Sequence, residues 1–467
     1  MTALNTTVFQ ATRPFGWRDK VGYLFGDLGN DFLFIFASAY LLVFYTNVAG
    51  LNPAHVGTLF LLTRLLDAFT DVFWGRFLDR HTPSRAGRFR VWIGRAAPLL
   101  VVASALLYVP FISEWTYTAK LVYAVVTYIL WGSVFYTMVN ISYGSLASVV
   151  SGVPAHRASL SVFRGVGANI AALFVALVPP LVIYATVDGV SQVLPGAFFV
   201  TGLVFSAAAL VFYVFCYSLV RERVHAQPVE GRSFGQLLRS LAGNRALIAL
   251  MAGNLTLMLA SLLTGSMAAY LWLNYFNKGA LSGPAQFAQY LPALLIAPVA
   301  PLLASRIGKR ETLVVALAAT SALYLLLYVL HTDSPWVFIV LTLLAGVGLG
   351  LFNLLVWAII GDVIDHEEVR SGERDDGTVY AVNTWARKLG LALAGGLGGY
   401  ALSLVGFQSG QTEQSAATIE GIYTVATLVP GILYAVVAAI FLFWYPLSRA
   451  RVAANVATLA ERREADA

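Results

Sequence analysis

The chain alternates long apolar stretches with short polar segments. A helix that crosses the hydrocarbon core of a membrane needs about 20 mostly apolar residues, and the sequence offers that length twelve times. We therefore expect an all-α membrane protein with twelve transmembrane helices. The predicted spans lie near residues 22–48, 54–78, 91–112, 117–147, 160–186, 195–219, 246–277, 286–305, 311–331, 336–361, 378–405 and 420–445.

Composition supports a lipid environment. Hydrophobic residues make up 58% of the 467 residues and charged residues only 12%, with a mean hydropathy of +0.74. A soluble fold cannot bury that much apolar surface. The single cysteine, Cys216, excludes an intramolecular disulfide. Because no P-loop, dinucleotide-binding glycine pattern, zinc spacing or nucleophile elbow occurs in a suitable setting, we expect neither an enzyme nor a resident cofactor.

Lysine and arginine are concentrated in alternate loops. The pI is about 9.3, but the basic residues form short clusters between apolar spans, which argues against a nucleic-acid partner. One set of loops holds nearly all of them, whereas the opposite loops contribute little more than Lys120 and Lys278. The positive-inside rule then places both termini in the cytoplasm.

The longest polar segment, residues 221–245, divides the chain into two six-helix halves. The predicted boundaries are 1–220 for the first half, 246–447 for the second half and 448–467 for a cytoplasmic tail. A basic motif after the second span, GRFLDRHTPSRAGRFR, has a weaker counterpart, ASRIGKRETL, after the eighth. Corresponding basic turns in the two halves indicate a duplication.

Charged residues inside the first and fifth spans are candidates for function, because a charge at mid-membrane is costly unless it faces a cavity or a partner. Asp27 and Asp31 lie one turn apart; a position near the end of the span can explain Asp27, so Asp31 is the candidate. Arg164 lies in an apolar run, with Gly165 and Gly167 close to it in the sequence. It can bind a carboxylate or vicinal sugar hydroxyls, or simply snorkel to the membrane surface.

The second span holds a cluster of polar residues on one face. Arg64, Asp67 and Asp71 share a helical stripe, with Thr70 beside them. Two carboxylates this close can surround a small cation with oxygens or share a proton. The alternative is a structural salt bridge between Arg64 and Asp67, but one arginine cannot neutralise both acids.

Charged residues of the second half suggest a gate. Asp362 and Asp365 share a face at the predicted end of span ten, where a helix terminus would expose them at little cost. We expect them to pair with arginines of the basic turn after span two, such as Arg80, and so to lock the two halves in one state. Lys388 lies inside span eleven and needs a carboxylate partner.

Aromatic side chains along several spans could stack on a sugar ring, although each is more simply explained by packing. We retain Tyr128 and Trp131 as candidates for substrate contact. The other aromatic positions considered are Tyr136, Tyr143, Trp357 and Trp385.

Three long segments are specific enough to suggest a family. They are GDLGNDF at 26–32, VGTLFLLTRLLDAFTDVFWGRFLDR at 56–80 and GDVIDHEEVRSGERDDGTVYAVNTWARKLG at 361–390. Together they resemble the glycoside-pentoside-hexuronide:cation symporters of the major facilitator superfamily, and the likeness covers nearly the whole chain. The resemblance implies a major facilitator fold in a bacterial inner membrane. We expect a functional monomer that moves a sugar or glycoside together with H⁺ or Na⁺.

The resemblance also implies roles for individual residues. Asp31 and Arg164 match an acid and an arginine of the sugar site, and Lys388 matches a lysine between the sugar and the cation. The matches at the cation site are Asp67, Asp71 and Thr137, and the two acids are metal ligands only if the ion is Na⁺.

Two departures from the family pattern bear on the substrate and the ion. Asn140 stands where the family has a second sugar-binding aspartate, so an anionic sugar such as a uronide or a sulfo-sugar is less disfavoured. Thr70 stands where the family has a cation-site asparagine, which favours H⁺ over Na⁺. The sequence thus predicts a sugar importer; the alternatives are an exporter of drugs or amphipaths and a membrane sugar sensor that does not transport.

Overall fold

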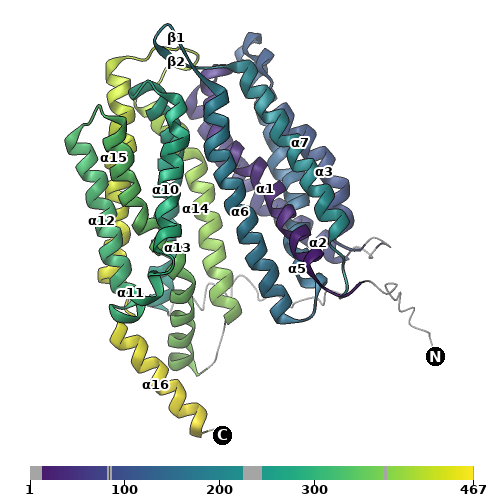
Figure 1. Ribbon diagram of the computed structural model, residues 1–467, viewed down its shortest axis with the longest axis vertical. Coiled ribbons are helices and arrows are strands. Elements are labelled where there is room, and N and C mark those ends of the chain that lie inside the picture. The colour runs from purple at the N-terminus through teal and green to yellow at the C-terminus, as the bar shows by residue number, and fades with distance from the viewer. Residues whose placement is uncertain (1–12, 81–83, 85–86, 225–243, 373–375, 466–467) are drawn as a thin grey trace. The chain divides into compact units, whose positions relative to one another are not determined.

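The computed structural model describes residues 13–80, 84, 87–224, 244–372 and 376–465, and most of them belong to long helices (Figure 1). These residues fall into two compact units. The first unit draws on residues 1–52, 62–185 and 193–229, and the second on 53–61, 186–192 and 230–467.

Helices of the first unit cover the first six predicted spans. They are α1 (Trp17–Val43), most of α2 (Pro53–Arg80), α3 (Arg90–Leu106), α4 (Tyr117–Ile129), α5 (Thr137–Val150), α6 (Pro154–Ile183) and α7 (Pro195–Leu219). Three short elements complete them: the π-helical turns η1 (Phe44–Val48) and η3 (Leu130–Tyr136) and the 3-10 helix η2 (Pro110–Glu114). Because η3 continues α4 directly into α5, these three elements form one span.

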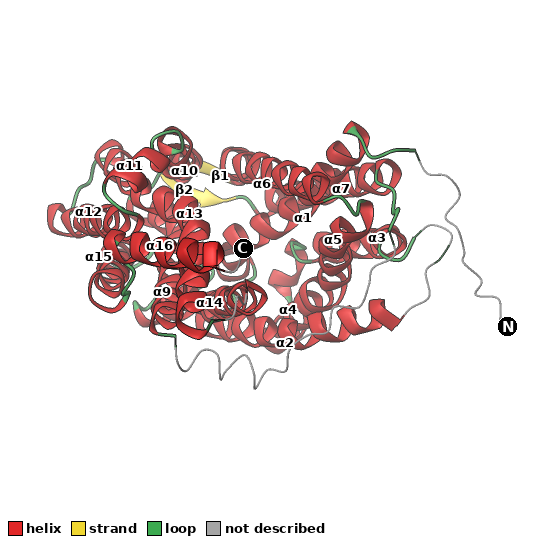
Figure 2. Ribbon diagram, turned by 90° about the horizontal axis from the view of Figure 1, so that it is seen from below, coloured by secondary structure: helices red, strands yellow, loops and turns green. Residues whose placement is uncertain are grey.

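Helix α1 packs along both α6 and α7, and the three helices lie side by side (Figure 2). Close packing depends on positions that lack a side chain. A Cβ atom at Gly167 of α6 would lie 2.7 Å from the carbonyl oxygen of Leu24, and one at Gly29 of α1 would lie 3.2 Å from that of Ala209. Glycine at these positions allows the backbones to approach closely.

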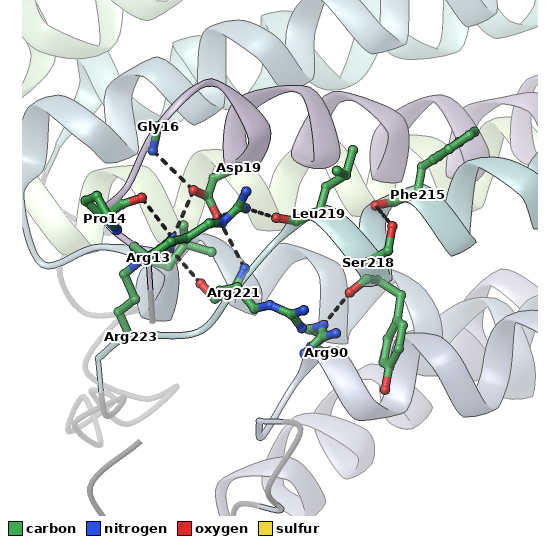
Figure 3. Close-up of polar contacts among 12 residues, drawn as sticks. Arg13, Pro14, Gly16, Asp19, Arg90, Phe215, Ser218, Leu219, Arg221 and Arg223 are labelled. Atoms are coloured by element: carbon green, nitrogen blue, oxygen red, sulfur yellow. Dashed lines mark hydrogen bonds and ion pairs between the residues drawn. The ribbon is translucent and has the colours of Figure 1, made fainter. Parts of the chain in front are cut away.

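A buried carboxylate near the start of α1 ties the chain after α7 to this helix. Asp19 has no exposed surface. It accepts hydrogen bonds from Arg223 at 2.9 Å, from Arg13 at 3.2 Å and from the backbone N–H of Gly16 at 3.2 Å (Figure 3). These bonds satisfy the buried charge and fix the entry into α1.

A second buried carboxylate, Glu222, caps α3. It accepts hydrogen bonds from three consecutive backbone N–H groups, those of residues 88–90, at 2.7–2.8 Å. These donors have no partner within the helix, and the N-terminal end of a helix favours a negative charge. The residues after α7 therefore hold the starts of both α1 and α3.

A small β-hairpin between α6 and α7 was not predicted from the apolar pattern. Its strands are β1 (Tyr184–Val187) and β2 (Val190–Val193). The turn residues Asp188 and Gly189 have φ values of 51° and 82°, as a two-residue hairpin turn requires. The Asp-Gly pair between two runs rich in β-branched residues is the sequence signal for this hairpin.

The second unit contains the helices of the last six spans. They are α9 (Arg245–Tyr270), α10 (Ser282–Ile296), α11 (Ala300–Arg306), α12 (Lys309–Leu330), α13 (Pro335–Ser371), α14 (Asp376–Leu404), α15 (Ala416–Ala439) and α16 (Arg449–Ala465). The short elements are η4 (Leu271–Tyr275), η5 (Gly279–Leu281) and η6 (Ile440–Trp444). Pro298 interrupts the eighth span, which therefore consists of α10 and α11.

Helix α13 is longer than the sequence predicted. The tenth span was expected to end near residue 361, but α13 continues to Ser371 and ends at Gly372, where φ is 78°. The segment GDVIDHEEVR is therefore helical, and Asp362 is buried instead of exposed at a helix terminus. The prediction that Asp362 is exposed at a helix end is wrong, because α13 continues past this residue.

Eight helical stretches among the described residues are long and apolar enough to cross a membrane. The remaining predicted spans correspond to α2, α3, α10 with α11, and α14. They are less uniform, since α2 carries several charges and α3 has only 17 residues. The predicted all-α membrane fold is confirmed, with a helical segment at every predicted span.

Candidate transport site

The first group of charged residues joins α1 to α6. Asp27 is only 3% exposed, and its Oδ1 atom lies 2.9 Å from Nε of Arg164. The guanidinium also lies over the ring of Tyr143, 5.6 Å from its centroid. Asp27 therefore lies inside the unit with a charged partner, and a position at the end of the span does not explain it.

Asp31 lies one turn beyond Asp27 in a different environment. It is partly exposed, and its carboxylate makes no hydrogen bond with any residue that the structure describes. The preceding residue, Asn30, is buried and accepts a hydrogen bond of 2.8 Å from the hydroxyl of Tyr213. The Asp31 carboxylate is thus an acceptor available to a ligand, beside a guanidinium that already has one partner.

A second group of charged residues lies on α2 beside η3. Asp67 forms a salt bridge of 3.2 Å with Arg64, and its other oxygen accepts a hydrogen bond of 2.5 Å from Ser133. The guanidinium of Arg64 also lies over the ring of Phe34, 4.9 Å from its centroid. The salt bridge considered as an alternative is present, and Ser133 is a partner that the sequence analysis missed.

Asp71 receives a matching hydrogen bond one turn further along α2. Its Oδ1 atom accepts a bond of 3.1 Å from the hydroxyl of Thr137. The same sequence separation of 66 residues joins Asp67 to Ser133 and Asp71 to Thr137. The polar groups of α2 therefore lie in register with those of η3 and the start of α5. Thr70 instead donates to the backbone carbonyl of Asp67 at 3.1 Å.

The second group can hold a small cation only with help from neutral oxygens. Among the described residues, no three histidine, cysteine, aspartate or glutamate side chains gather as a metal site. A sodium ion between Asp67 and Asp71 would therefore need hydroxyl or carbonyl oxygens as further ligands. A proton needs no such shell.

The other sugar-site candidates of the first unit are less accessible or lack partners. Tyr128 and Trp131 stack with their ring centroids 5.6 Å apart, and they are 4% and 1% exposed, so they offer a substrate little surface. Tyr136 is less buried and stacks against Phe34. Asn140 is partly exposed and makes no hydrogen bond within the described part of the chain.

The candidates for gating lie in different units. In the second unit, Lys309 forms a salt bridge of 2.6 Å with Asp362, and Asp365 follows one turn later, partly exposed. In the first unit, Arg80 is exposed as the last residue of α2. Lys388 belongs to α14, but its side chain lies outside the described residues.

Long apolar helices that carry paired charges are typical of a polytopic membrane transporter. A family model described as MFS/sugar transport protein matches residues 22–449. The chain belongs to this family of transporters, and the resemblance to the glycoside-pentoside-hexuronide symporters is confirmed. It is not an enzyme.

Individual relatives support the same assignment. The chain is 32% identical over 438 residues to the "Glucuronide carrier protein homolog" of Escherichia coli strain K12, covering 92% of this chain and 93% of the relative. Another protein of that strain has the provisional name 2,3-dihydroxypropane-1-sulfonate exporter. It is 32% identical over 437 residues, covering 92% of this chain and 92% of the relative.

A solved structure supports the fold. The crystal structure of a D-xylose-proton symporter matches with a TM-score of 0.64 at 12% sequence identity, covering 92% of this chain and 97% of that one. At this identity the likeness concerns the fold alone.

Proposed function

We propose that the protein is a symporter that imports an anionic sugar or glycoside together with a proton. The observation that supports this most is the separation of two polar groups within one unit. Asp27, Asp31 and Arg164 provide hydrogen-bonding groups for a ligand on α1 and α6, whereas Asp67 and Asp71 form a pair of carboxylates on α2 that can bind a cation. Separate sites for substrate and cation are what a symporter needs.

Arg164 supports an anionic substrate. Its side chain is 47% exposed although one of its nitrogens is bound to Asp27, so further donors of the guanidinium remain for a carboxylate or a sulfonate. Asn140 adds no negative charge. The relatives named for a glucuronide and for a sulfonate are consistent with this substrate class.

The surroundings of the two acids on α2 favour a proton as the coupling ion. Arg64 lies 3.2 Å from Asp67 and already compensates one negative charge. The remaining charge of the pair can be neutralised by one proton without the oxygen shell of a hard cation. Sodium remains the alternative, with Ser133 and Thr137 as additional oxygen ligands.

Coupling follows if the carrier reorients more readily when both sites are filled or both are empty. Protonation removes a negative charge from the membrane interior, and the substrate occupies the hydrogen-bonding groups of α1 and α6. Uphill movement of the sugar is then driven by the entry of protons.

The test uses the full chain in proteoliposomes, with radiolabelled methyl glucuronide as the anionic probe. Asp71→Asn should abolish accumulation driven by a pH gradient but preserve exchange of labelled for unlabelled sugar. Asp31→Ala should weaken binding measured by calorimetry by about one to two orders of magnitude, since a lost hydrogen-bonding partner costs about 1–3 kcal/mol. Accumulation that follows a sodium gradient alone would replace the proton by sodium. If Asp71→Asn still concentrates the sugar, the assigned roles are wrong.

An exporter of a small sulfonate is the second candidate, because one relative carries that name. Vesicles of known orientation distinguish the two directions. Uptake into vesicles oriented as in the cell supports import, whereas uptake only into inverted vesicles supports export. Exchange of varied apolar cations would indicate a drug exporter, and sugar binding without exchange would indicate a sensor.

A further inference from the structure

A groove lies between α3 and α7 of the first unit, and none of the candidate transport residues lines it. Its volume is about 360 Å³. The two helices lie side by side (Figures 1 and 2). Most of the groove is apolar, with Val91, Ala97 and Pro98 on α3 and Leu210 and Val214 on α7 among its lining residues.

The outer faces of these helices are exposed and apolar. Leu99 and Val102 of α3 are 49% and 59% exposed, and Val211 and Val214 of α7 are 51% and 57% exposed. In a protein that spans a membrane, such a face lies against lipid chains. The groove therefore opens toward the hydrocarbon, and its natural occupant is an acyl chain.

A basic side chain from the first half of α3 lies at the groove. Arg95 lines the groove, is exposed, and lies over the ring of Trp92 at 5.3 Å from its centroid. It forms no ion pair with any residue that the structure describes. The nearby acid Glu222 is already engaged by three backbone N–H groups.

Arg90, one turn earlier on α3, differs from Arg95. It is 8% exposed, donates to the carbonyl oxygen of Tyr217, and lies over that ring at 4.2 Å (Figure 3). Arg90 is thus satisfied inside the protein, whereas Arg95 has no counterion among the described residues at the apolar surface. A charge in this position is costly unless an anion accompanies it.

We propose that this groove binds an anionic phospholipid, with an acyl chain between α3 and α7 and the headgroup phosphate on Arg95. Basic side chains beside grooves between membrane helices recognise such headgroups. A soluble anion would leave the apolar part of the groove empty, and a neutral lipid would leave Arg95 without its counterion. The predicted cytoplasmic position of both termini would place the site in the inner leaflet.

Bound lipid should stabilise the first unit. Tyr213 forms part of the groove wall, and its hydroxyl donates to Asn30 of α1 at 2.8 Å. An acyl chain in the groove would therefore pack against a side chain that links α7 to α1. Lipid binding should raise the temperature of thermal unfolding.

The experiment titrates delipidated full-length protein in detergent with dioleoyl phosphatidylglycerol and measures affinity by native mass spectrometry beside the unfolding temperature. Arg95→Gln should weaken the affinity about fivefold, as expected for one basic residue at an anionic headgroup. Val214→Trp should also weaken it by filling the groove. Arg157→Gln, which removes an exposed cation at the start of α6, should leave the affinity unchanged.

Two further ligands test the chemistry of the site. Dioleoyl phosphatidylcholine should stabilise the protein less than phosphatidylglycerol does, and glycerol phosphate should not stabilise it. Equal stabilisation by both lipids would overturn the role of charge, and stabilisation by glycerol phosphate would overturn the role of the acyl chain. Equal affinity of Arg95→Gln and the unmodified chain for phosphatidylglycerol would overturn the site itself. None of these measurements uses a sugar, so they stand apart from the proposed transport function.

Discussion

Two aspartates one turn apart on α1 have different surroundings. Asp27 is paired with Arg164, whereas Asp31 has no hydrogen-bond partner among the described residues. The sequence indicated that both share a helix face, but it could not show which of them meets an arginine 137 residues later. That assignment depends on the packing of α6 against α1, which a single sequence does not specify.

The pair on α2 shows the same limit. Spacing on one helix predicted that Asp67 and Asp71 lie together, because residues three or four apart share a face. The partner Ser133 was missed, because a serine in an apolar span is common and only the register between α2 and η3 gives it a role. Thr137 was found through the family resemblance and not from the spacing.

At this scale we predict that Asp27 and Arg164 are energetically coupled. Arg164→Gln leaves a buried carboxylate without its cation, which should destabilise the protein by about 1–3 kcal/mol. Asp27→Asn should cost less, because the Arg164 side chain can reach solvent or headgroups. The double variant should be more stable than the sum of the two losses implies. Thermal unfolding of the purified chain measures all three, with Arg157→Gln as the control. Strictly additive losses would show that the two charges do not interact.

At the scale of elements, apolar length was the reliable guide. It placed a helix at every predicted span because lipid requires each span to satisfy its own backbone hydrogen bonds. Features that lipid does not enforce were missed: the hairpin of β1 and β2, the π-helical turns and the extension of α13. They depend on turn chemistry or on packing beyond the apolar core, for which hydropathy carries no information.

Two glycines of α6 allow a sharp test of helix packing. A Cβ atom at Gly167 would lie 2.7 Å from the carbonyl oxygen of Leu24, whereas one at Gly165 would meet nothing within 4 Å. We expect Gly167→Ala to push α6 away from α1 and to lower stability by about 1–3 kcal/mol. Gly165→Ala should be neutral or slightly stabilising, since alanine favours a helix by about 1 kcal/mol over glycine. Unfolding temperatures of the two variants in the same detergent provide the measurement. Equal losses would mean that glycine acts here through helix propensity and not through close approach.

At the scale of the whole molecule, the two units repeat a detail of local structure. Helix α1 of the first unit and α9 of the second both end in a π-helical turn, η1 and η4. Each turn is closed by backbone hydrogen bonds with the same spacing: residues 49 and 51 donate to 44 and 45, and residues 276 and 278 donate to 271 and 272. The repeated geometry supports the duplication suggested by the basic turns. The domain boundaries drawn from the sequence remain a prediction.

The two units should be coupled during transport by charged residues at the ends of their helices. Asp362 is held inside the second unit by Lys309 at 2.6 Å, so the gate is better tested at Arg80 and Asp365. Arg80→Ala and Asp365→Asn should each slow net sugar transport severalfold while leaving sugar affinity within about threefold, because a contact that locks one state affects reorientation more than binding.

If the two residues act on each other, the double variant should be no slower than the slower single variant. Arg157→Ala, which removes an exposed cation at the start of α6 outside the basic turn, is the control and should transport normally. Rates of net uptake and of exchange in proteoliposomes, with sugar affinity by calorimetry, give the comparison. Losses that multiply in the double variant would show that Arg80 and Asp365 act independently, and a parallel loss of binding would place them in the sugar site.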